Sequence, residues 1–423
     1  MLKRLATSPS YAMVLLFLAY TMNFVDRQLI TVLLNDIRAD LGLSDAQLGI
    51  ISGAGFALFY VIAGVPLGYL ADRINRSRLL AASIIVWSGM TALCGAASSF
   101  TQMLLARIGV AVGEAGGTPA SLSLIGDYYP PAVRSSKLGI YFSGAALATM
   151  VSYAVGGWVN EMFGWRVTFA LFALPGILIG LALLFTIQEP PRGRFDEGKP
   201  VADLTLRRGL AVLMRTPLFP TLCLGYVGSN FVLYTVLTWG PSVAMRSYGL
   251  GSGDIGLLMG LTSGIVAGAA HILGGLLADR LRRAGGHVPL YYTAATQVAC
   301  ALLVLAFLTA GSFSLFAVFF ALAFGAGALY AAPSMAVTQS ILPPNLRAMG
   351  AAILLLFGTV AGLGMGPLIV GALSDHLHPV HGEQSLRLAL LVLVLVGLLT
   401  SLVYAYAAWR LRADPQDTAM EPG

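Results

Sequence analysis

Residues 11–34 read YAMVLLFLAYTMNFVDRQLITVLL, an apolar run that carries two adjacent charged residues, Asp26 and Arg27. A helix needs about 20 predominantly apolar residues to cross the hydrocarbon core of a bilayer. The run is too long for the apolar core of a signal peptide, and no small-residue cleavage site follows it. We therefore expect a retained membrane-spanning helix that places ionisable groups within the bilayer.

The composition extends this expectation to the whole chain of 423 residues. Hydrophobic residues make up 57% and charged residues 10%, whereas about 25% of an average soluble chain is charged. We predict an all-α polytopic membrane protein with twelve transmembrane helices. Eleven further spans are expected near residues 47–70, 78–98, 101–125, 137–160, 165–187, 218–245, 254–278, 289–310, 314–340, 348–372 and 386–408.

The twelve predicted spans fall into two groups of six. A polar stretch rich in Pro, Gly and charge occupies residues 188–215, which predicts an N-terminal bundle over 1–187, a cytoplasmic linker over 188–215 and a C-terminal bundle over 216–423. Three short motifs recur in order in the second half. They are 23–25 with 230–232 and 68–73 with 275–280, both at an offset of 207, and 130–134 with 343–347 at an offset of 213. This duplication predicts two pseudo-symmetric bundles that rock about a central site for alternating access.

The distribution of Lys and Arg predicts the orientation. With the N-terminus inside, 19 of the 25 basic residues lie in the tails and the even-numbered loops, and four lie on the opposite side. Basic residues favour the cytoplasmic side of a membrane. We expect both termini in the cytoplasm of a bacterial inner-membrane protein. The net charge of +6 therefore bears on topology and not on nucleic-acid binding.

The loop after the second predicted span carries the most specific motif. Gly68-Tyr69-Leu70-Ala71-Asp72-Arg73, followed by Arg76 and Arg78, resembles signature A of the major facilitator superfamily, with Asn75 where a Gly is usual. A second copy contains Asp279 and Arg280. The resemblance implies a gating motif formed by Gly68, Asp72, Arg73, Asp279 and Arg280. We expect Asp72 to cap a helix end and the arginines to stay in the cytoplasmic headgroup layer.

Within that superfamily, two further segments resemble the spinster-like transporters. They are Asn23-Phe24-Val25-Asp26-Arg27 in the first span and Arg107 with Gly113-Glu114-Ala115 in the fourth. The resemblance implies proton-linked movement of lysophospholipids or sphingosine-phosphate-type lipids, with Arg27 facing Glu114 and Asp26 near Arg107. Similar residues also occur in organic-anion symporters of the superfamily, so a sugar acid or similar anion is the alternative substrate.

The four intramembrane charges suggest how transport is coupled. Asp26, Arg27, Arg107 and Glu114 each cost about 2.5–3.5 kcal/mol at mid-membrane, and a packing network without a transport role gives little reason to keep them. Arginine stays protonated in proteins, so Asp26 and Glu114 are the candidates for proton coupling. Arg27 and Arg107 are the candidates for binding a substrate phosphate or carboxylate, a geometry that arginine favours.

The C-terminal half offers neutral polar stripes instead. Asn230, Tyr234 and Thr238 recur every four residues in the seventh span, and Tyr330, Ser334 and Thr338 do so in the tenth, where Pro333 should bend the helix. We expect Asn230, Tyr234 and Tyr330 to contact substrate; inter-helix hydrogen bonding is the alternative. A charged half and a neutral half together suit an amphipathic substrate.

The remaining reactive side chains favour structural roles. The three cysteines lie in apolar runs, His271 is read as a packing histidine or a second proton site, and His376, His378 and His381 as solvated histidines of an outer loop. The chain has no HExxH or GxSxG motif. We expect no metal, no cofactor and no enzymatic activity. The expected partners are substrate, protons and membrane lipids, and the expected state is a monomer.

Overall fold

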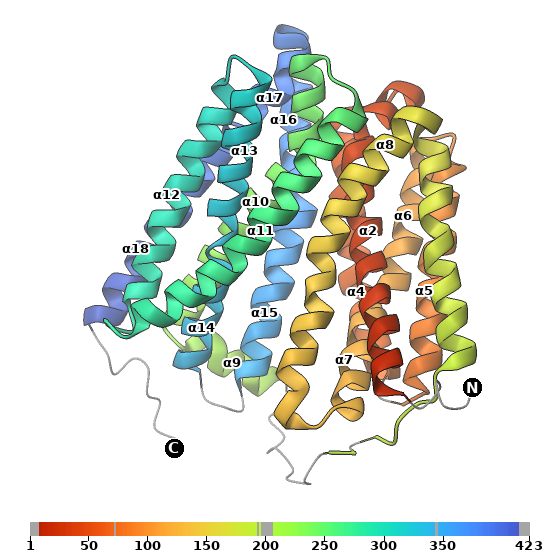
Figure 1. The fold of residues 1–423 in the computed structure, drawn as a ribbon. Coiled ribbons are helices and arrows are strands. Elements are labelled where there is room, and N and C mark those ends of the chain that lie inside the picture. The colour runs from red at the N-terminus through yellow and green to blue at the C-terminus, as the bar shows by residue number, and fades with distance from the viewer. Residues whose placement is uncertain (1–7, 72, 193, 196–205, 343–345, 414–423) are drawn as a thin grey trace. The chain divides into compact units, whose positions relative to one another are not determined.

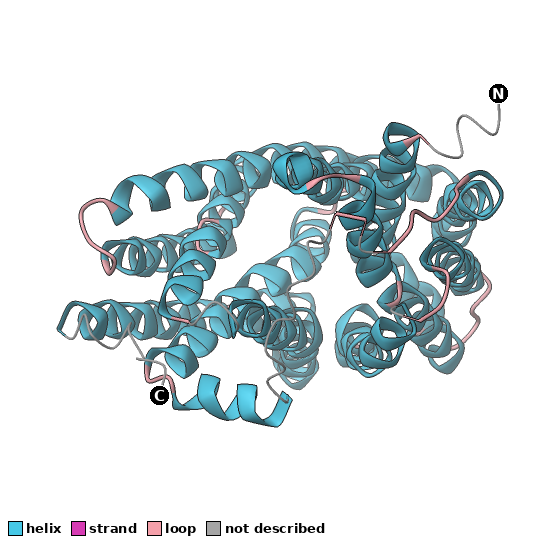
Figure 2. Cartoon of the chain, turned by 90° about the horizontal axis from the view of Figure 1, so that it is seen from below, coloured by secondary structure: helices cyan, strands magenta, loops and turns pink. Residues whose placement is uncertain are grey.

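A computed structural model describes residues 8–71, 73–192, 194–195, 206–342 and 346–413. Every regular element in these ranges is a helix, and short loops join them (Figures 1 and 2). The predicted all-α fold is therefore confirmed. Contacts divide the chain into two compact units, one formed by Met1–Lys199 with Gly249–Gly264 and the other by Pro200–Tyr248 with Ile265–Gly423. We call them unit 1 and unit 2 and describe each by itself.

Unit 1 holds the helices of the N-terminal half and the first part of α11. Its elements are α2 (Pro9–Leu41), α3 (Asp45–Gly49), the π-helical η1 (Ile50–Ala54), α4 (Gly55–Ala71), α5 (Arg76–Gly95), α6 (Phe100–Ala115), α7 (Gly117–Tyr128) and α8 (Pro131–Thr186). Helix α11 (Ser252–Arg282) begins in this unit and ends in unit 2.

Unit 2 holds the remaining helices. Its elements are α9 (Leu206–Arg215), α10 (Leu218–Tyr248), α12 (Val288–Thr309), α13 (Phe313–Ala328), α14 (Ala331–Ile341), α15 (Arg347–Thr359), the π-helical η3 (Val360–Met365), α16 (Gly366–His381), the 3₁₀ turn η4 (Gly382–Gln384), α17 (Ser385–Ala389) and α18 (Val392–Ala413).

Nine helical stretches in the described part of the chain are long and apolar enough to cross a membrane. Two of them, 137–186 with 50 residues and 349–413 with 65 residues, are each long enough for two crossings. Helices α6 and α7 together cover the fourth predicted span, but Gly116 separates them. The observed helices therefore cover all twelve predicted spans.

Local sequence explains where these helices begin and end. The Ser8 hydroxyl accepts a hydrogen bond from the backbone N–H of Tyr11, and Pro9 occupies the first helical position of α2. Gly42 ends α2 in the left-handed conformation with φ of 63°, which glycine adopts without steric cost. Gly164, with φ of 78°, turns the chain inside α8 between the fifth and sixth spans. These residues set the span boundaries.

The sequence repeat has counterparts in the backbone. Ser99 caps the N-terminus of α6 and Ser312, 213 positions later, caps that of α13. The break between α6 and α7 falls at Gly116, and the same offset leads to Leu329, at the break between α13 and α14. This second break lies just before Pro333. Proline disfavours the interior of a helix, because it lacks a backbone N–H and clashes with the preceding turn. Both halves thus interrupt the same span.

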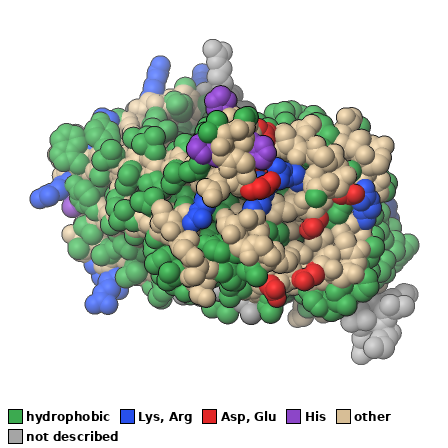
Figure 3. Space-filling model, turned by 90° about the horizontal axis from the view of Figure 1, so that it is seen from above, with side chains coloured by type: hydrophobic (Ala, Val, Ile, Leu, Met, Phe, Trp, Pro, Cys, Tyr) green, Lys and Arg blue, Asp and Glu red, His purple; other side chains and the backbone are tan. Residues whose placement is uncertain are grey.

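Two predicted irregular segments are partly helical. Helix α9 lies inside the predicted linker, and Leu213 of this helix is buried in the core of unit 2. The predicted outer loop with His376, His378 and His381 was wrong, because α16 continues through all three. Histidine side chains gather on the surface seen from above in Figure 3. Among the described residues, no group of three or more His, Cys, Asp or Glu side chains is placed to hold a metal.

Glycines let α8 and the start of α11 approach closely within unit 1. A Cβ at Gly256 would overlap the backbone carbonyl of Tyr153, and one at Gly157 would overlap that of Ser252. The Ser252 hydroxyl donates to the Gly157 carbonyl over 3.1 Å, and Glu161 accepts from the backbone N–H of Gly253 over 2.8 Å. Small residues of this kind allow backbone-to-backbone packing in membranes.

This packing predicts that Gly256→Ala lowers the stability of the purified protein by about 1–3 kcal/mol, the usual cost of an overpacked contact. Gly268→Ala in the same helix is the matched control, because no atom of the described residues lies within 4 Å of its Cβ position. Thermal unfolding in detergent should show a lower melting temperature for Gly256→Ala alone. Equal melting temperatures for the two variants would contradict the close packing.

Candidate functional site

The first candidate site of unit 1 centres on an ion pair between α2 and α6. The Nε atom of Arg27 donates to Oε2 of Glu114 over 2.6 Å. The Glu114 side chain is 0% exposed and the Arg27 side chain 12%. This is the pairing that the family resemblance implied. The buried carboxylate holds a guanidinium that still reaches accessible surface.

Aromatic rings surround the Arg27 guanidinium. Its Cζ atom lies 5.1 Å from the ring centre of Phe24, 5.2 Å from Phe56 and 4.6 Å from Tyr60. Cations within about 6 Å of a ring face are attracted by the ring quadrupole. The rings therefore compensate part of the desolvation of Arg27. Phe56 and Tyr60 could not be predicted as neighbours of Arg27, because they lie on α4 and only the folded chain brings them to α2.

Arg107 braces the backbone around this pair. It is buried, and its Nε atom donates to the carbonyl of Ile51 over 3.2 Å while Nη1 donates to the carbonyl of Asp26 over 3.1 Å. Ile51 belongs to the π-helical turn η1, an irregularity often found at functional sites. Arg107 thus ties α6 to α2 and to η1. Its contact with substrate stays a prediction.

Asp26 lies among buried polar groups whose hydrogen bonds are incomplete. Thr91 and Trp87 face its carboxylate, and the charges of Arg107 and Glu114 act on it, as expected from the resemblance. In the described part of the chain, one oxygen each of Asp26 and Glu114 and the polar atoms of Asn23, Trp87 and Thr91 complete no hydrogen bond. Such groups are rare in buried positions and call for an explanation.

The predicted polar stripe of unit 2 bonds mainly within its own helix. The amide of Asn230 donates to the Tyr226 carbonyl over 2.8 Å, and the Thr238 hydroxyl donates to the Tyr234 carbonyl over 2.9 Å. These two side chains therefore donate hydrogen bonds within α10, and not to another helix as the alternative expected. Asn230 keeps its amide oxygen as an acceptor, so it remains a candidate for substrate contact.

Tyr330, another predicted contact residue of unit 2, belongs to a buried core cluster that also contains Tyr226 and Tyr404. Tyr330 is buried and its ring meets that of Tyr226 edge-on at 5.4 Å. The Ser334 hydroxyl donates to the Tyr404 hydroxyl over 2.9 Å. Tyr404 comes from α18, and only the folded chain brings it to Ser334 of α14. The core of unit 2 is aromatic and uncharged at these positions.

The gating motif is only partly described. Asp72 lies outside the described residues, as does the side chain of Asp279. Arg280 is exposed, and the Arg73 guanidinium lies 3.7 Å from the ring centre of Tyr69. Among the described residues, no atom lies within 4 Å of a Cβ built at Gly68.

Arg76 pairs with carboxylates inside unit 1, and its place in the headgroup layer stays a prediction. Its side chain is buried and donates to Glu189 over 2.7 Å, to the Ser123 hydroxyl over 2.9 Å and to Asp127. Two carboxylates neutralise the cation, which makes its burial affordable. The cluster fastens the start of the predicted linker to unit 1. Nearby, burial raises the pKa of Tyr128 to about 12, so this tyrosine stays protonated and donates to the Gln188 carbonyl over 2.6 Å.

Comparison with known proteins places this arrangement in context. The model of the Major Facilitator Superfamily matches residues 16–364. An MFS-type efflux pump of Mycolicibacterium smegmatis is 34% identical over 401 residues, which cover 94% of this chain and 92% of that protein. A probable L-galactonate transporter of Escherichia coli is 29% identical over 304 residues, which cover 68% of this chain and 65% of that protein.

A solved structure matches along nearly the whole chain. It is a bacterial homolog of the human lysosomal transporter Spinster in an inward-facing, unoccupied conformation. The TM-score is 0.88 at 28% sequence identity, and the match covers 98% of this chain and 99% of that one.

The geometry of the ion pair predicts a strong coupling between Arg27 and Glu114. Arg27→Met alone should destabilise the protein by about 3–5 kcal/mol, because it leaves a buried carboxylate unpaired. The double variant Arg27→Met/Glu114→Gln should recover most of this loss. Melting temperatures of the purified single and double variants measure the coupling.

The exposed pair of Arg166 with Asp40, in which both side chains are 44% exposed, provides the control. Arg166→Met should lower the melting temperature much less, because exposed pairs contribute little. Additive effects of Arg27→Met and Glu114→Gln would show that the two side chains do not depend on each other.

Proposed function

Because the chain belongs to the Major Facilitator Superfamily and is spinster-like, we propose that it moves lysophospholipid or sphingolipid-type substrates across the membrane in exchange with or together with protons. Members of this superfamily are transporters rather than enzymes. The protein spans the membrane many times. We further propose that it works as a monomer in a bacterial inner membrane with both termini in the cytoplasm, since Lys and Arg concentrate on that side.

The observation that carries the proposal is the ion pair of Arg27 with Glu114. The carboxylate is wholly buried while the guanidinium keeps some exposure. A substrate phosphate can compete with Glu114 for the guanidinium, because arginine binds both carboxylates and phosphates through two parallel hydrogen bonds. Protonation of Glu114 weakens its hold on Arg27 and so favours the exchange. Arg27 is then the binding residue and Glu114 the group that links binding to protons.

Asp26 gives the second proton-linked position. Its carboxylate lies beside Thr91 and Trp87 and within the electrostatic influence of Glu114 and Arg107. Two interacting carboxyl groups in one site titrate as a coupled pair. A protonated carboxyl can donate a hydrogen bond as well as accept one, which would satisfy part of the incomplete bonding described above. Asp26 and Glu114 are therefore proposed to take up and release protons together.

An amphipathic substrate fits the contrast between the two units. Unit 1 offers a guanidinium, whereas the candidate positions of unit 2, Asn230, Tyr234 and Tyr330, are neutral and mostly aromatic. Aromatic side chains combine a large apolar surface with a polar tip. They suit an acyl chain with a nearby glycerol or amino-alcohol backbone. Arg27 and Arg107 are proposed to attract the phosphate.

A small organic anion is the second candidate substrate. The similarity to a probable L-galactonate transporter of Escherichia coli favours it. The same Arg27 would then bind a sugar-acid carboxylate, and the hydroxyl groups of Tyr234 and Tyr330 would bind sugar hydroxyls. The similarity to the Mycolicibacterium smegmatis efflux pump supports outward transport for either substrate.

The substrate proposal is tested with purified protein in liposomes under an imposed pH gradient. Lysophosphatidylcholine, lysophosphatidylglycerol and sphingosine-phosphate should cross in a protein-dependent manner, while galactonate and glucuronate should not. Arg27→Gln should abolish the lipid flux, because its amide cannot bind a phosphate through two charged donors. Sugar-acid flux without lipid flux would replace the first candidate by the second.

The coupling proposal makes a separate prediction about pH. Asp26→Asn and Glu114→Gln should each fold, bind substrate and lose the dependence of transport on the pH gradient, because neither amide titrates. Asp254→Asn, at an exposed position in the first turn of α11, should keep the wild-type pH profile. Initial rates across a range of internal and external pH values provide the measurement. Wild-type profiles in both test variants would end the proposal.

A further inference from the structure

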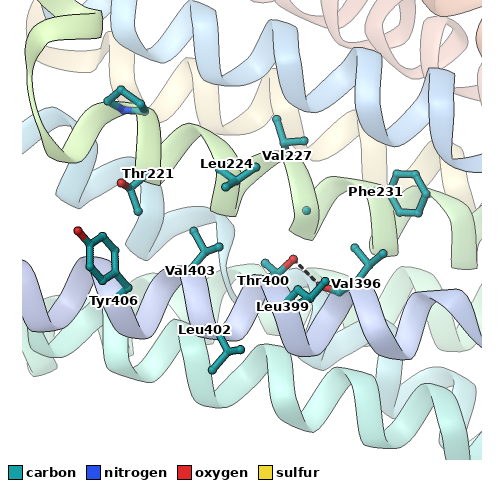
Figure 4. Close-up of a pocket in the computed structure, with 12 residues that line it drawn as sticks. Thr221, Leu224, Val227, Phe231, Val396, Leu399, Thr400, Leu402, Val403 and Tyr406 are labelled. Carbon is teal, nitrogen blue, oxygen red and sulfur yellow. Dashed lines mark hydrogen bonds between the residues drawn. The ribbon is translucent and has the colours of Figure 1, made fainter.

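Helices α10 and α18 of unit 2 enclose an apolar groove of about 840 Å³ (Figure 4). Its walls include Leu224 and Phe231 of α10 and Leu399 and Val403 of α18. Gly228 lets the two helices approach closely at the floor, because a Cβ there would overlap the Thr400 hydroxyl. That hydroxyl donates to the Val396 carbonyl over 2.7 Å within its own helix. The polar group at the floor is therefore satisfied, and the groove offers an apolar surface.

The length of the groove along its two helices matches the thickness of one bilayer leaflet. It runs from Pro220 to Phe231 on α10 and from Val396 to Tyr406 on α18, and Figure 4 shows Tyr406 and Phe231 at opposite ends. At a rise of 1.5 Å per residue both stretches are about 15 Å long. This is half of the hydrocarbon thickness of about 30 Å. An acyl chain of a single leaflet therefore matches the groove in length and polarity.

The Tyr406 end of the groove continues into an aromatic and basic surface. On α18, the groove positions Leu399, Val403 and Tyr406 follow a three-and-four spacing, and Arg410 is the next position on the same face. Tyr406 and Trp409 are exposed and their rings lie 6.0 Å apart. Tyr and Trp favour the membrane interface, and Arg near a helix end extends toward the headgroups. An anionic headgroup at this end would meet a cation.

We propose that this groove is a binding site for a bilayer glycerophospholipid with an anionic headgroup. One acyl chain lies between α10 and α18, the glycerol region lies beside Tyr406, and the phosphate lies within reach of Arg410. The site is separate from the residues proposed for transport. None of its lining residues is among the charged residues proposed in unit 1 or the neutral ones proposed in unit 2. The inference depends on the membrane-spanning fold and does not depend on the proposed substrate.

Native mass spectrometry of the full-length protein tests the site. The protein in a detergent micelle is titrated with dioleoyl phosphatidylglycerol and, separately, with dioleoyl phosphatidylcholine. We expect one phosphatidylglycerol to bind more tightly than the next ones and more tightly than phosphatidylcholine. Leu399→Trp fills the groove and should abolish this preferred binding. Leu302→Trp on α12 is the matched control, since Leu302 and Leu399 are 56% and 53% exposed and Leu302 does not line the groove.

The headgroup part of the proposal has its own variant pair. Arg410→Gln should weaken the preferred phosphatidylglycerol binding about fivefold, the effect of one basic residue near an anionic lipid. Arg412→Gln should leave it unchanged, because two residues along a helix rotate the side chain by about 200° away from the groove.

Three outcomes would overturn the inference. The first is equal loss of binding in Leu399→Trp and Leu302→Trp, which would indicate unspecific lipid adhesion. The second is equal affinity for the two lipids in the wild-type protein, which would remove the headgroup role. The third is a lipid-free dimer that Leu399→Trp dissociates, which would show that a second copy of the chain occupies the groove.

Discussion

The buried ion pair of Arg27 with Glu114 constrains the architecture of unit 1. An ionised carboxylate at 0% exposure is tolerated in a membrane only beside a cation, and a missing partner would cost several kcal/mol. Helices α2 and α6 must therefore keep a fixed rotation and distance. The side chain of Arg107 helps to fix this geometry, because it donates to the backbone carbonyls of Asp26 and Ile51. Helices α2 and α6 and the π-helical turn η1 are thus held around the ion pair.

Small residues around Glu114 allow this arrangement. A Cβ at Gly113 would lie 2.8 Å from the Cβ of Trp87, and one at Gly116 would lie 2.7 Å from the Ser83 hydroxyl oxygen. Both contacts are tighter than ordinary van der Waals packing, so α6 can lie against α5 only because these positions lack side chains. Gly116 also caps the C-terminus of α6, two residues after Glu114. In the Gly-Glu-Ala-Gly sequence, the two glycines thus allow the helices to pack closely, and the glutamate supplies the carboxylate that pairs with Arg27.

The sequence predicted the spans and the presence of charged residues within them, because the free energy of transfer into the membrane is set residue by residue. The pairing of Arg27 with Glu114 followed from a family resemblance, since helix geometry alone left the partner open. Arg76 shows what could not be predicted: its burial depends on Asp127 and Glu189, which are 51 and 113 positions away. Helix α9 was missed because its apolar face is short and its core contacts come from distant helices.

The two halves of the repeat differ at the positions of the intramembrane charges. Applying the offsets of 207 and 213, Asp26 and Arg27 correspond to Leu233 and Tyr234, and Arg107 and Glu114 correspond to Phe320 and Gly327. The spatial relation persists without the charge: a Cβ at Gly327 would lie 3.4 Å from the Leu233 side chain, where unit 1 has Glu114 acting on Asp26. At this contact both units bring corresponding positions together, and the contact in unit 2 forms without the charges that unit 1 carries.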